Sequence, residues 1–154
     1  MEVGVVLAVR LASVDEITFS TCLKHDLWGA NNVYINKWKE GDSLICKIGD
    51  SIIAFAKIVG QAYMDDTVIW TNGLFWNRIQ IEFEYVLDFQ DAIPFKGELR
   101  DMFIAEWGKN YGWVILNKYP LTDDISEFIH NEFRKRQNII NTVKQEIALG
   151  TPIS

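Results

Sequence analysis

The residues in this sequence best suited to chemistry are two histidines and a pair of adjacent aspartates. His25 stands directly before Asp26 and could polarise a substrate, whereas His130 lies far along the chain. Asp65 and Asp66 could bind a divalent cation, but an oxygen cage for such an ion needs more ligands. We therefore interpret His25-Asp26 as the end of a helix and Asp65-Asp66 as an exposed turn, and predict no metal site.

The sequence carries none of the short motifs that mark common enzymes. Glycine-rich phosphate loops, dinucleotide fingerprints, zinc-protease motifs and serine-hydrolase elbows are all absent. The two cysteines, Cys22 and Cys46, lack the C-x-x-C spacing of a zinc site, and we expect free thiols in a reducing, cytoplasmic setting, with a disulfide as the less favoured alternative. We predict that the chain is not an enzyme and needs no cofactor.

Tryptophan is unusually frequent, with six residues in 154. Large aromatic side chains supply much of the energy of ligand pockets and of cores, so either role is open for each of them. Trp70 and Trp76 bracket a loop-like stretch, whereas Trp38, Trp107 and Trp113 are expected to lie in the core.

Composition limits the ways in which the chain could bind a partner. A hydrophobic fraction of 49% supports one domain with a real core. The apolar stretches Val3–Leu11 and Leu44–Val59 are short or interrupted by charge, so we interpret them as buried strands and expect no membrane partner. With a net charge of −6, binding to nucleic acid would have to rely on a pocket and a few local cations.

The chain's hydrophobic patterns predict strands in the middle and helices around them. Ser13 and Glu16 form a capping box for a helix that runs toward His25. The other predicted elements are a first strand over 3–9, a short helix over 31–38, a hairpin of strands over 43–48 and 51–62, a short strand over 67–70, an alternating strand over 78–87, a core strand over 111–116 and a long helix over 123–149. This order favours an α+β fold, with a bent mixed sheet or small β-barrel flanked by helices.

An ordered series of short motifs resembles a known family. The series is Lys24-His25-Asp26-Leu27-Trp28-Gly29, Glu40-Gly41-Asp42, Ile58-Val59-Gly60, Tyr63-Met64-Asp65 and Ile93-Pro94-Phe95. In this order it resembles the EVE and YTH domains of the PUA-like superfamily, over roughly Val3 to Leu116. The resemblance implies a PUA-like base-recognition domain over 1–120. Residues 121–154 would form a C-terminal helix that packs on it and leads toward a further domain.

The resemblance also implies a binding site. In that family two tryptophans form walls around a modified base, and the matching positions here are Trp28 and Trp70. The loop that supplies the third wall is shorter in this chain, so Leu74, Phe75 or Trp76 would have to serve. Side chains near these walls complete the predicted site: Asn31, Asn32 and Asn72 for the base edge, and Arg10, Lys24 and Arg78 for phosphates.

Such a site would read a base that has left the base stack. Flipping costs a few kcal/mol, aromatic stacking returns about 1–3 kcal/mol per base, and a buried methyl group adds roughly 0.8 kcal/mol. The resemblance therefore favours a reader of modified nucleic acid, with modified DNA preferred over RNA, acting as the recognition domain of a McrB-type restriction system with a linked AAA+ GTPase domain. The alternatives are an RNA-binding PUA-like module, and a module that binds a methylated peptide or small molecule with help from Asp26 or Asp65.

Overall fold

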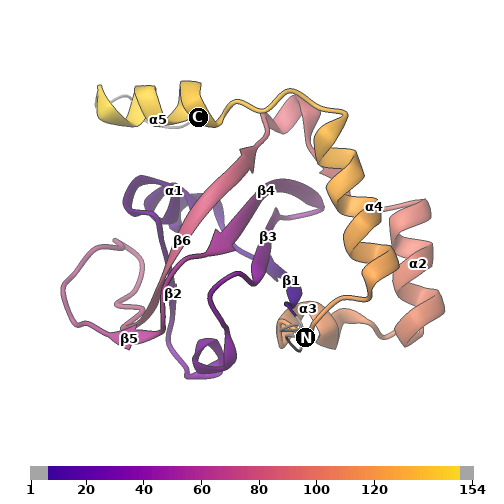
Figure 1. Cartoon of the computed structure of the whole chain (residues 1–154), viewed down its shortest axis with the longest axis horizontal. Coiled ribbons are helices and arrows are strands. Elements are labelled where there is room, and N and C mark those ends of the chain that lie inside the picture. The colour runs from indigo at the N-terminus through magenta and orange to yellow at the C-terminus, as the bar shows by residue number, and fades with distance from the viewer. Residues whose placement is uncertain (1–6, 150–154) are drawn as a thin grey trace, which may run out of the picture.

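A computed structural model describes residues 7–149, which fold around one curled mixed sheet (Figure 1). The main strand order is β1-β3-β4-β6-β2. Strand β1 (Val9–Ser13) runs parallel to β3 (Ser43–Ile48), whereas β4 (Ser51–Ile58), β6 (Asn77–Val86) and β2 (Leu27–Ala30) join by antiparallel pairing. The predicted bent mixed sheet with flanking helices is therefore confirmed.

Two very short strands pair with the first residues of two central strands. Strand β5 (Tyr63–Met64) pairs with the start of β6, and β7 (Ile93–Pro94) pairs with the start of β4. The predicted short strand over 67–70 does not form, and these residues lie in a loop between β5 and β6.

Side chains along β6 alternate between buried and exposed positions. Ile79, Ile81 and Phe83 are buried, while the intervening polar residues such as Gln80 and Glu82 are exposed. A strand with this period buries only one of its faces, as the sequence predicted. The hairpin that turns at residues 49–50 is confirmed as well, because Cys46 pairs with Ala54 across it.

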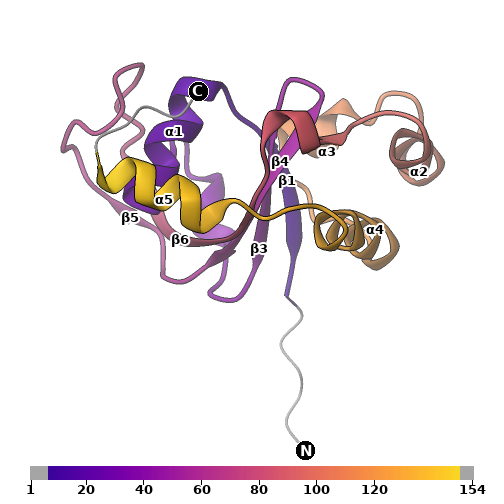
Figure 2. The same ribbon diagram turned by 90° about the horizontal axis from the view of Figure 1, so that it is seen from above.

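Helices cover both faces of the sheet and create two hydrophobic cores (Figure 2). Helices α1 (Glu16–His25) and α5 (Ile140–Ala148) enclose the first core, which contains Trp28, Trp38 and Trp70. The second core contains residues of α2 (Glu98–Trp107), α3 (Gly112–Leu116) and α4 (Asp123–Arg134) together with Leu11, Ile45 and Phe55 of the sheet.

The N-terminal elements begin later than expected. The first strand lies at residues 9–13 rather than 3–9, and residues 1–6 lie outside the described part of the chain. Asp15, and not Ser13, caps α1, because its carboxylate accepts a hydrogen bond of 2.7 Å from Thr18 N. Aspartate and serine are both good N-caps, so the sequence alone could not separate two candidates that stand two positions apart.

The C-terminal third differs most from the sequence prediction. The apolar run before residue 117 forms the short helix α3 instead of a strand, and Trp113, expected in the core, is 43% exposed. A short apolar run suits a buried strand and a buried helix equally well. The segment over 31–38 contains a 3-10 helix, Tyr34–Lys37.

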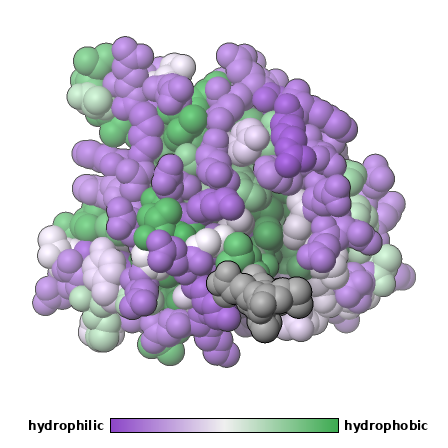
Figure 3. Space-filling model, viewed as in Figure 1, coloured by the Kyte–Doolittle hydropathy of each residue, from purple (hydrophilic) through white to green (hydrophobic). Residues whose placement is uncertain are grey.

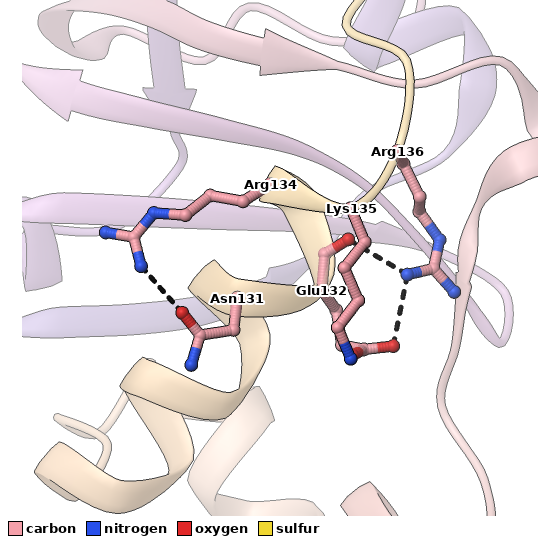
Figure 4. A network of polar contacts seen from close by, with 5 residues as sticks. All are labelled: Asn131, Glu132, Arg134, Lys135 and Arg136. Carbon is pink, nitrogen blue, oxygen red and sulfur yellow. Dashed lines mark hydrogen bonds and ion pairs between the residues drawn. The ribbon is translucent and has the colours of Figure 1, made fainter.

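The predicted long helix over 123–149 is broken into α4 and α5. Arg136 Nη1 donates to the main-chain oxygen of Glu132 at 2.9 Å and to its carboxylate at 3.1 Å (Figure 4). It thereby gives a main-chain oxygen in the last turn of α4 a hydrogen-bond donor. Asn138 then bonds the end of β6, accepting from Val86 N and donating to Glu84 O. These contacts turn the chain across the sheet before α5 begins. The division into residues 1–120 and 121–154 stays a prediction.

The surface of the described residues is mixed in character. The face in Figure 3 is mainly hydrophilic, and hydrophobic side chains show in separate patches between polar ones. Within residues 7–149, none of the helices combines the length and apolar character required to span a bilayer.

Candidate functional site

An open cavity of about 690 Å³ lies beside the N-terminus of α1. This volume falls in the range of small-molecule sites, roughly 300–1,000 Å³. Five separate chain segments meet there: the entry to α1, strand β2 with the loop that follows it, the tip of the β3–β4 hairpin, the loop before β6, and the turn after α3. The residues that line it include Asp15, Glu16, Thr18, Trp28, Gly29, Asn31, Asn32, Tyr34, Phe75 and Lys118.

Trp28 forms one wall of the cavity from strand β2. Pairing of Trp28 with Ile79 of β6 fixes the strand, and the indole packs on Trp38 with ring centroids 6.4 Å apart. Its Nε1 donates a hydrogen bond of 3.1 Å to the hydroxyl of Tyr34. Only 4% of Trp28 is exposed, so it presents an edge rather than a full face to the cavity.

Tyr34 is a second aromatic lining residue, and it was not among the residues predicted from the sequence. Its ring packs against Trp38 at 5.5 Å, and burial raises the pKa of its phenol to about 12. A signal was present in the sequence, since Tyr34 follows Trp28 closely in the loop between the wall and Trp38. The hydroxyl accepts from Trp28, so the two side chains act as one rigid unit.

Trp70 lies behind the cavity and does not line it. The ring is 1% exposed, packs edge-on against Phe75 at 5.4 Å, and is covered by the guanidinium of Arg78 at 5.2 Å. A Cβ added at Gly29 would lie 2.6 Å from Trp70 Cη2, so glycine is what lets the indole pack against β2. The prediction of Trp70 as an open wall is therefore wrong, because Phe75 takes that place.

Arg78 holds the loop before β6 from the inside and cannot contact a phosphate. The side chain is fully buried and donates to the main-chain oxygens of Thr67, Leu74 and Phe75. Its prediction as a phosphate contact is wrong for that reason. The buried guanidinium instead fixes the loop that carries Phe75.

The other two predicted phosphate contacts do not line the cavity. Arg10 donates to the carboxylate of Asp42 at 2.8 Å, lies against Trp38, and is 11% exposed in its side chain. This pairing leaves it unsuited to a phosphate. Lys24 is exposed near the end of α1, away from the cavity lining.

Three asparagines were predicted to contact a base edge, and two of them line the cavity. Asn31 Oδ1 accepts from Phe75 N at 3.2 Å, and Asn32 Oδ1 accepts from Tyr34 N at 3.1 Å. Both oxygens are engaged, so the amide nitrogens are the groups left to donate. Asn72 does not line the cavity, since it donates to Thr18 Oγ1 at 2.6 Å and fastens its loop to α1.

Of the three candidates for the third wall, Phe75 alone lines the cavity. Leu74 and Trp76 are 39% and 45% exposed and are not among the residues that line it. Phe75 adopts a left-handed backbone conformation with φ of 45°, which is uncommon for a bulky residue. Sequence spacing does not reveal a left-handed residue of this kind, so it could not separate Phe75 from its two neighbours.

Charged groups at the cavity have opposite signs. Hydrogen bonds from Thr18 lower the pKa of Asp15, whose carboxylate also accepts from Asn72, and Glu16 lies beside it. Lys118 reaches the cavity from the turn after α3, and burial lowers the pKa of its amine. The rings of Tyr34 and Phe75 and the amides of Asn31 and Asn32 can together hold a flat guest and bond its edge. Within the described residues, the lining carries no set of groups arranged for catalysis.

Comparison with known proteins identifies the fold. No family model and no curated protein matches the sequence. Among solved structures, the chain is similar to the YTH domain of Zygosaccharomyces rouxii MRB1 in complex with N6-methyladenosine RNA, with a TM-score of 0.60 and 11% identity over 91% of this chain and 95% of that one. It is also similar to human THYN1 in complex with 5-methylcytosine DNA, with a TM-score of 0.53 and 18% identity over 84% and 99%. The chain has the PUA-like fold that the motif series predicted.

Proposed function

We propose that this chain binds a modified base of a nucleic acid in the cavity beside Trp28 and performs no chemistry on it. The observation that carries the proposal is the aromatic lining of that cavity by Trp28, Tyr34 and Phe75. The similar YTH and THYN1 structures were solved with methylated RNA and methylated DNA, which supports the same class of ligand here.

The geometry suits a flat guest with acceptor atoms on its edge. Aromatic side chains stack on any base, and the amide nitrogens of Asn31 and Asn32 are left to donate to ring nitrogens or carbonyl oxygens. A methyl group buried among Trp28, Tyr34 and Phe75 would contribute roughly 0.8 kcal/mol. That energy corresponds to about a fourfold preference for the modified base.

The finer proposal is methylated DNA, read for a restriction system of the McrB type with a linked AAA+ GTPase. The THYN1 complex supports DNA, whereas the YTH complexes support the alternative of methylated RNA. Both cysteines are free and buried, which supports the reducing compartment of the cytoplasm.

A cationic methylated peptide is the second candidate, because aromatic lining is here combined with carboxylates. Glu16 lines the cavity beside Asp15 and could pair with such a cation. The two carboxylates named from the sequence do not serve, since neither Asp26 nor Asp65 lines the cavity.

The test compares modified and unmodified ligands on the wild type and two neighbouring variants. We expect single-stranded oligonucleotides with one 5-methylcytosine or N6-methyladenine to bind a few-fold more tightly than unmodified ones, in matched DNA and RNA forms, by fluorescence anisotropy. Phe75→Ala should weaken binding about 5- to 150-fold, because it removes a stacking surface worth about 1–3 kcal/mol.

Trp76→Ala is the matched control, since it removes an exposed aromatic from the same loop but not from the cavity. It should leave affinity unchanged. Equal affinity for modified and unmodified oligonucleotides, with no loss in Phe75→Ala, would contradict the proposal. Tighter binding of a trimethyl-lysine peptide would support the second candidate instead.

A further inference from the structure

Lys118 is the basic side chain that the fold brings to the cavity. Among the described residues that line it, no other carries a positive charge, although Asp15 and Glu16 contribute two carboxylates. The residue stands in the turn between α3 and α4 and beyond the stretch over which the motif series resembles the EVE and YTH domains. The C-terminal part of the chain thus adds a charge to a pocket made mainly by the N-terminal part.

The turn that carries Lys118 is built to hold it in place. Lys118 has a left-handed backbone with φ of 49°, and Tyr119 N donates to Val114 O at 2.8 Å across the turn. Val114 is fully buried in the second core, so the turn is fixed to the body of the protein. A non-glycine residue persists in this conformation where surrounding contacts over-determine it.

Contacts of the side chain direct its ammonium toward the aromatic part of the cavity. Lys118 Nζ lies 4.6 Å from the ring centre of Tyr34 and donates to Leu116 O at 3.2 Å. An ammonium has three N–H donors, so two remain for a ligand. The side chain is half-buried, which strengthens its interaction with an anion relative to a fully solvated lysine.

The charge balance of the chain makes one such cation important. Affinity for nucleic acid depends strongly on the number of phosphates that basic side chains neutralise, and this chain has a net charge of −6. Arg78 is engaged inside the loop and Arg10 is paired with Asp42. Asp15 already accepts from Thr18 and Asn72, so its carboxylate is directed into the protein's own contacts.

We propose that Lys118 binds the backbone phosphate next to the base held in the cavity. This inference rests on the proposed function, because it assigns the phosphate contact of the same site. The aromatic residues and asparagines would then hold the base, while Lys118 would distinguish a nucleotide within a strand from a free nucleoside.

The experiment distinguishes the contribution of the phosphate to affinity from that of the base by comparing two ligands. One is the methylated nucleoside that the wild type prefers, and the other is a short oligonucleotide that contains it. For Lys118→Gln we expect nucleoside affinity within twofold of the wild type and oligonucleotide affinity about tenfold lower at low salt. The slope of log K against log salt should become shallower by about 0.7–0.9, as for the loss of one phosphate contact.

Three further variants make the result specific. Lys118→Arg should restore oligonucleotide binding and the salt slope. Lys109→Gln removes an exposed lysine of the same region that does not line the cavity, and should change neither. Lys118→Gly suits the left-handed backbone and guards against a misfolded glutamine variant.

Two results would overturn the inference and leave the proposed function standing. One is an equal loss for nucleoside and oligonucleotide with an unchanged salt slope, which would reduce Lys118 to packing on Tyr34. The other is no loss for either ligand in the glutamine and glycine variants. If neither ligand binds the wild type, the proposed function fails and the inference fails with it.

Discussion

Gly29 lies where strand β2, Trp70 and Phe75 meet, and the packing there leaves no room for a side chain. A Cβ at this position would lie 2.6 Å from Trp70 Cη2 and 2.8 Å from Phe75 Cβ. Both neighbours are held by Arg78, so they cannot move freely. We expect Gly29→Ala to lower the free energy of unfolding by about 1–3 kcal/mol, measured by urea denaturation.

Gly112→Ala is the matched control for this substitution. Gly112 begins α3, and an added Cβ would meet nothing within 4 Å. Alanine favours helices over glycine by up to about 1 kcal/mol, so this variant should be as stable as the wild type or more so. Equal destabilisation of both variants would show that the close approach at Gly29 does not limit packing.

At the residue scale, part of the cavity lining could be predicted from the sequence and part could not. Trp28, Asn31 and Asn32 follow one another along one strand and its loop, so a single correct placement brings all three to the cavity. Trp70 could not be judged in the same way, because its burial depends on Gly29 and Arg78 together. Lys118 was missed because nothing in its local sequence indicates a neighbour as distant as Tyr34.

The loop between β5 and β6 depends on one buried cation. Arg78 is fully buried and binds three main-chain oxygens of this loop, and it also stacks on Trp70. We expect Arg78→Met to lower the free energy of unfolding by about 2–4 kcal/mol, because three main-chain oxygens of the loop lose their charged donor. Limited proteolysis should then cut residues 65–76 faster than in the wild type.

Arg100→Met provides the comparison, since Arg100 is an exposed residue of α2. It should change neither stability nor the cleavage pattern. If the loop of Arg78→Met resists proteolysis as well as that of the wild type, the guanidinium does not hold this loop in place.

At the element scale, strands were predicted better than the helices of the C-terminal third. The hairpin and β6 have strict local signals, a Gly-Asp turn and a two-residue alternation. The segment that forms α3 is too short for any period to show. The break between α4 and α5 arises from a local bond of Arg136 to Glu132, which ends α4, and from tertiary bonds of Asn138 to β6. Local propensity favours one continuous helix there, and side-chain contacts with the sheet override it.

For the whole molecule, acid should be destabilising. Asp42 joins the residues before β1 to the turn before β3 by accepting from Ala8 N, Lys39 N and Arg10. Burial alone would raise the pKa of this carboxyl, but these hydrogen bonds more than offset it, so the pKa is lowered. Its contribution to stability is present above the ordinary carboxyl pKa near 3.8 and is lost as pH falls through the lowered value.

The histidines change stability in the same direction. Burial lowers the pKa of His25 and of His130, so the unfolded chain binds these protons more readily. Urea midpoints should therefore decrease from pH 7 through the histidine range. They should fall more steeply below about pH 4, where carboxyl groups of the unfolded chain take up protons and those with a lowered pKa in the folded chain remain charged.

Asp42→Asn isolates one part of this dependence. We expect a loss of roughly 2–4 kcal/mol at pH 7, because Arg10 loses its buried partner, and a smaller difference from the wild type at pH 3. Asp101→Asn, at an exposed position of α2, should follow the wild type at every pH. A constant difference between Asp42→Asn and the wild type across this range would contradict the linkage.

At this scale the sequence anticipated the architecture, because the order of strands, turns and helices is itself a signature of the fold. It could not anticipate which charges remain free. The sequence shows that Arg10, Arg78 and Lys118 are basic but not which of them is paired inside the protein. Tertiary pairing alone decides which of these side chains faces solvent at the cavity.

The two cysteines give the molecule a chemical reporter. Cys22 and Cys46 are free, with 1% and 0% exposure, and burial raises the pKa of Cys22 to about 12. Thiol-alkylating reagents attack thiolates that they can reach, so neither sulfur should react while the chain stays closed. Cys22 lies in α1 close to Trp70 and to the backbone of Gly29. Its labelling rate would therefore register how often the wall behind the cavity opens, and a bound guest that holds this wall shut would slow the reaction.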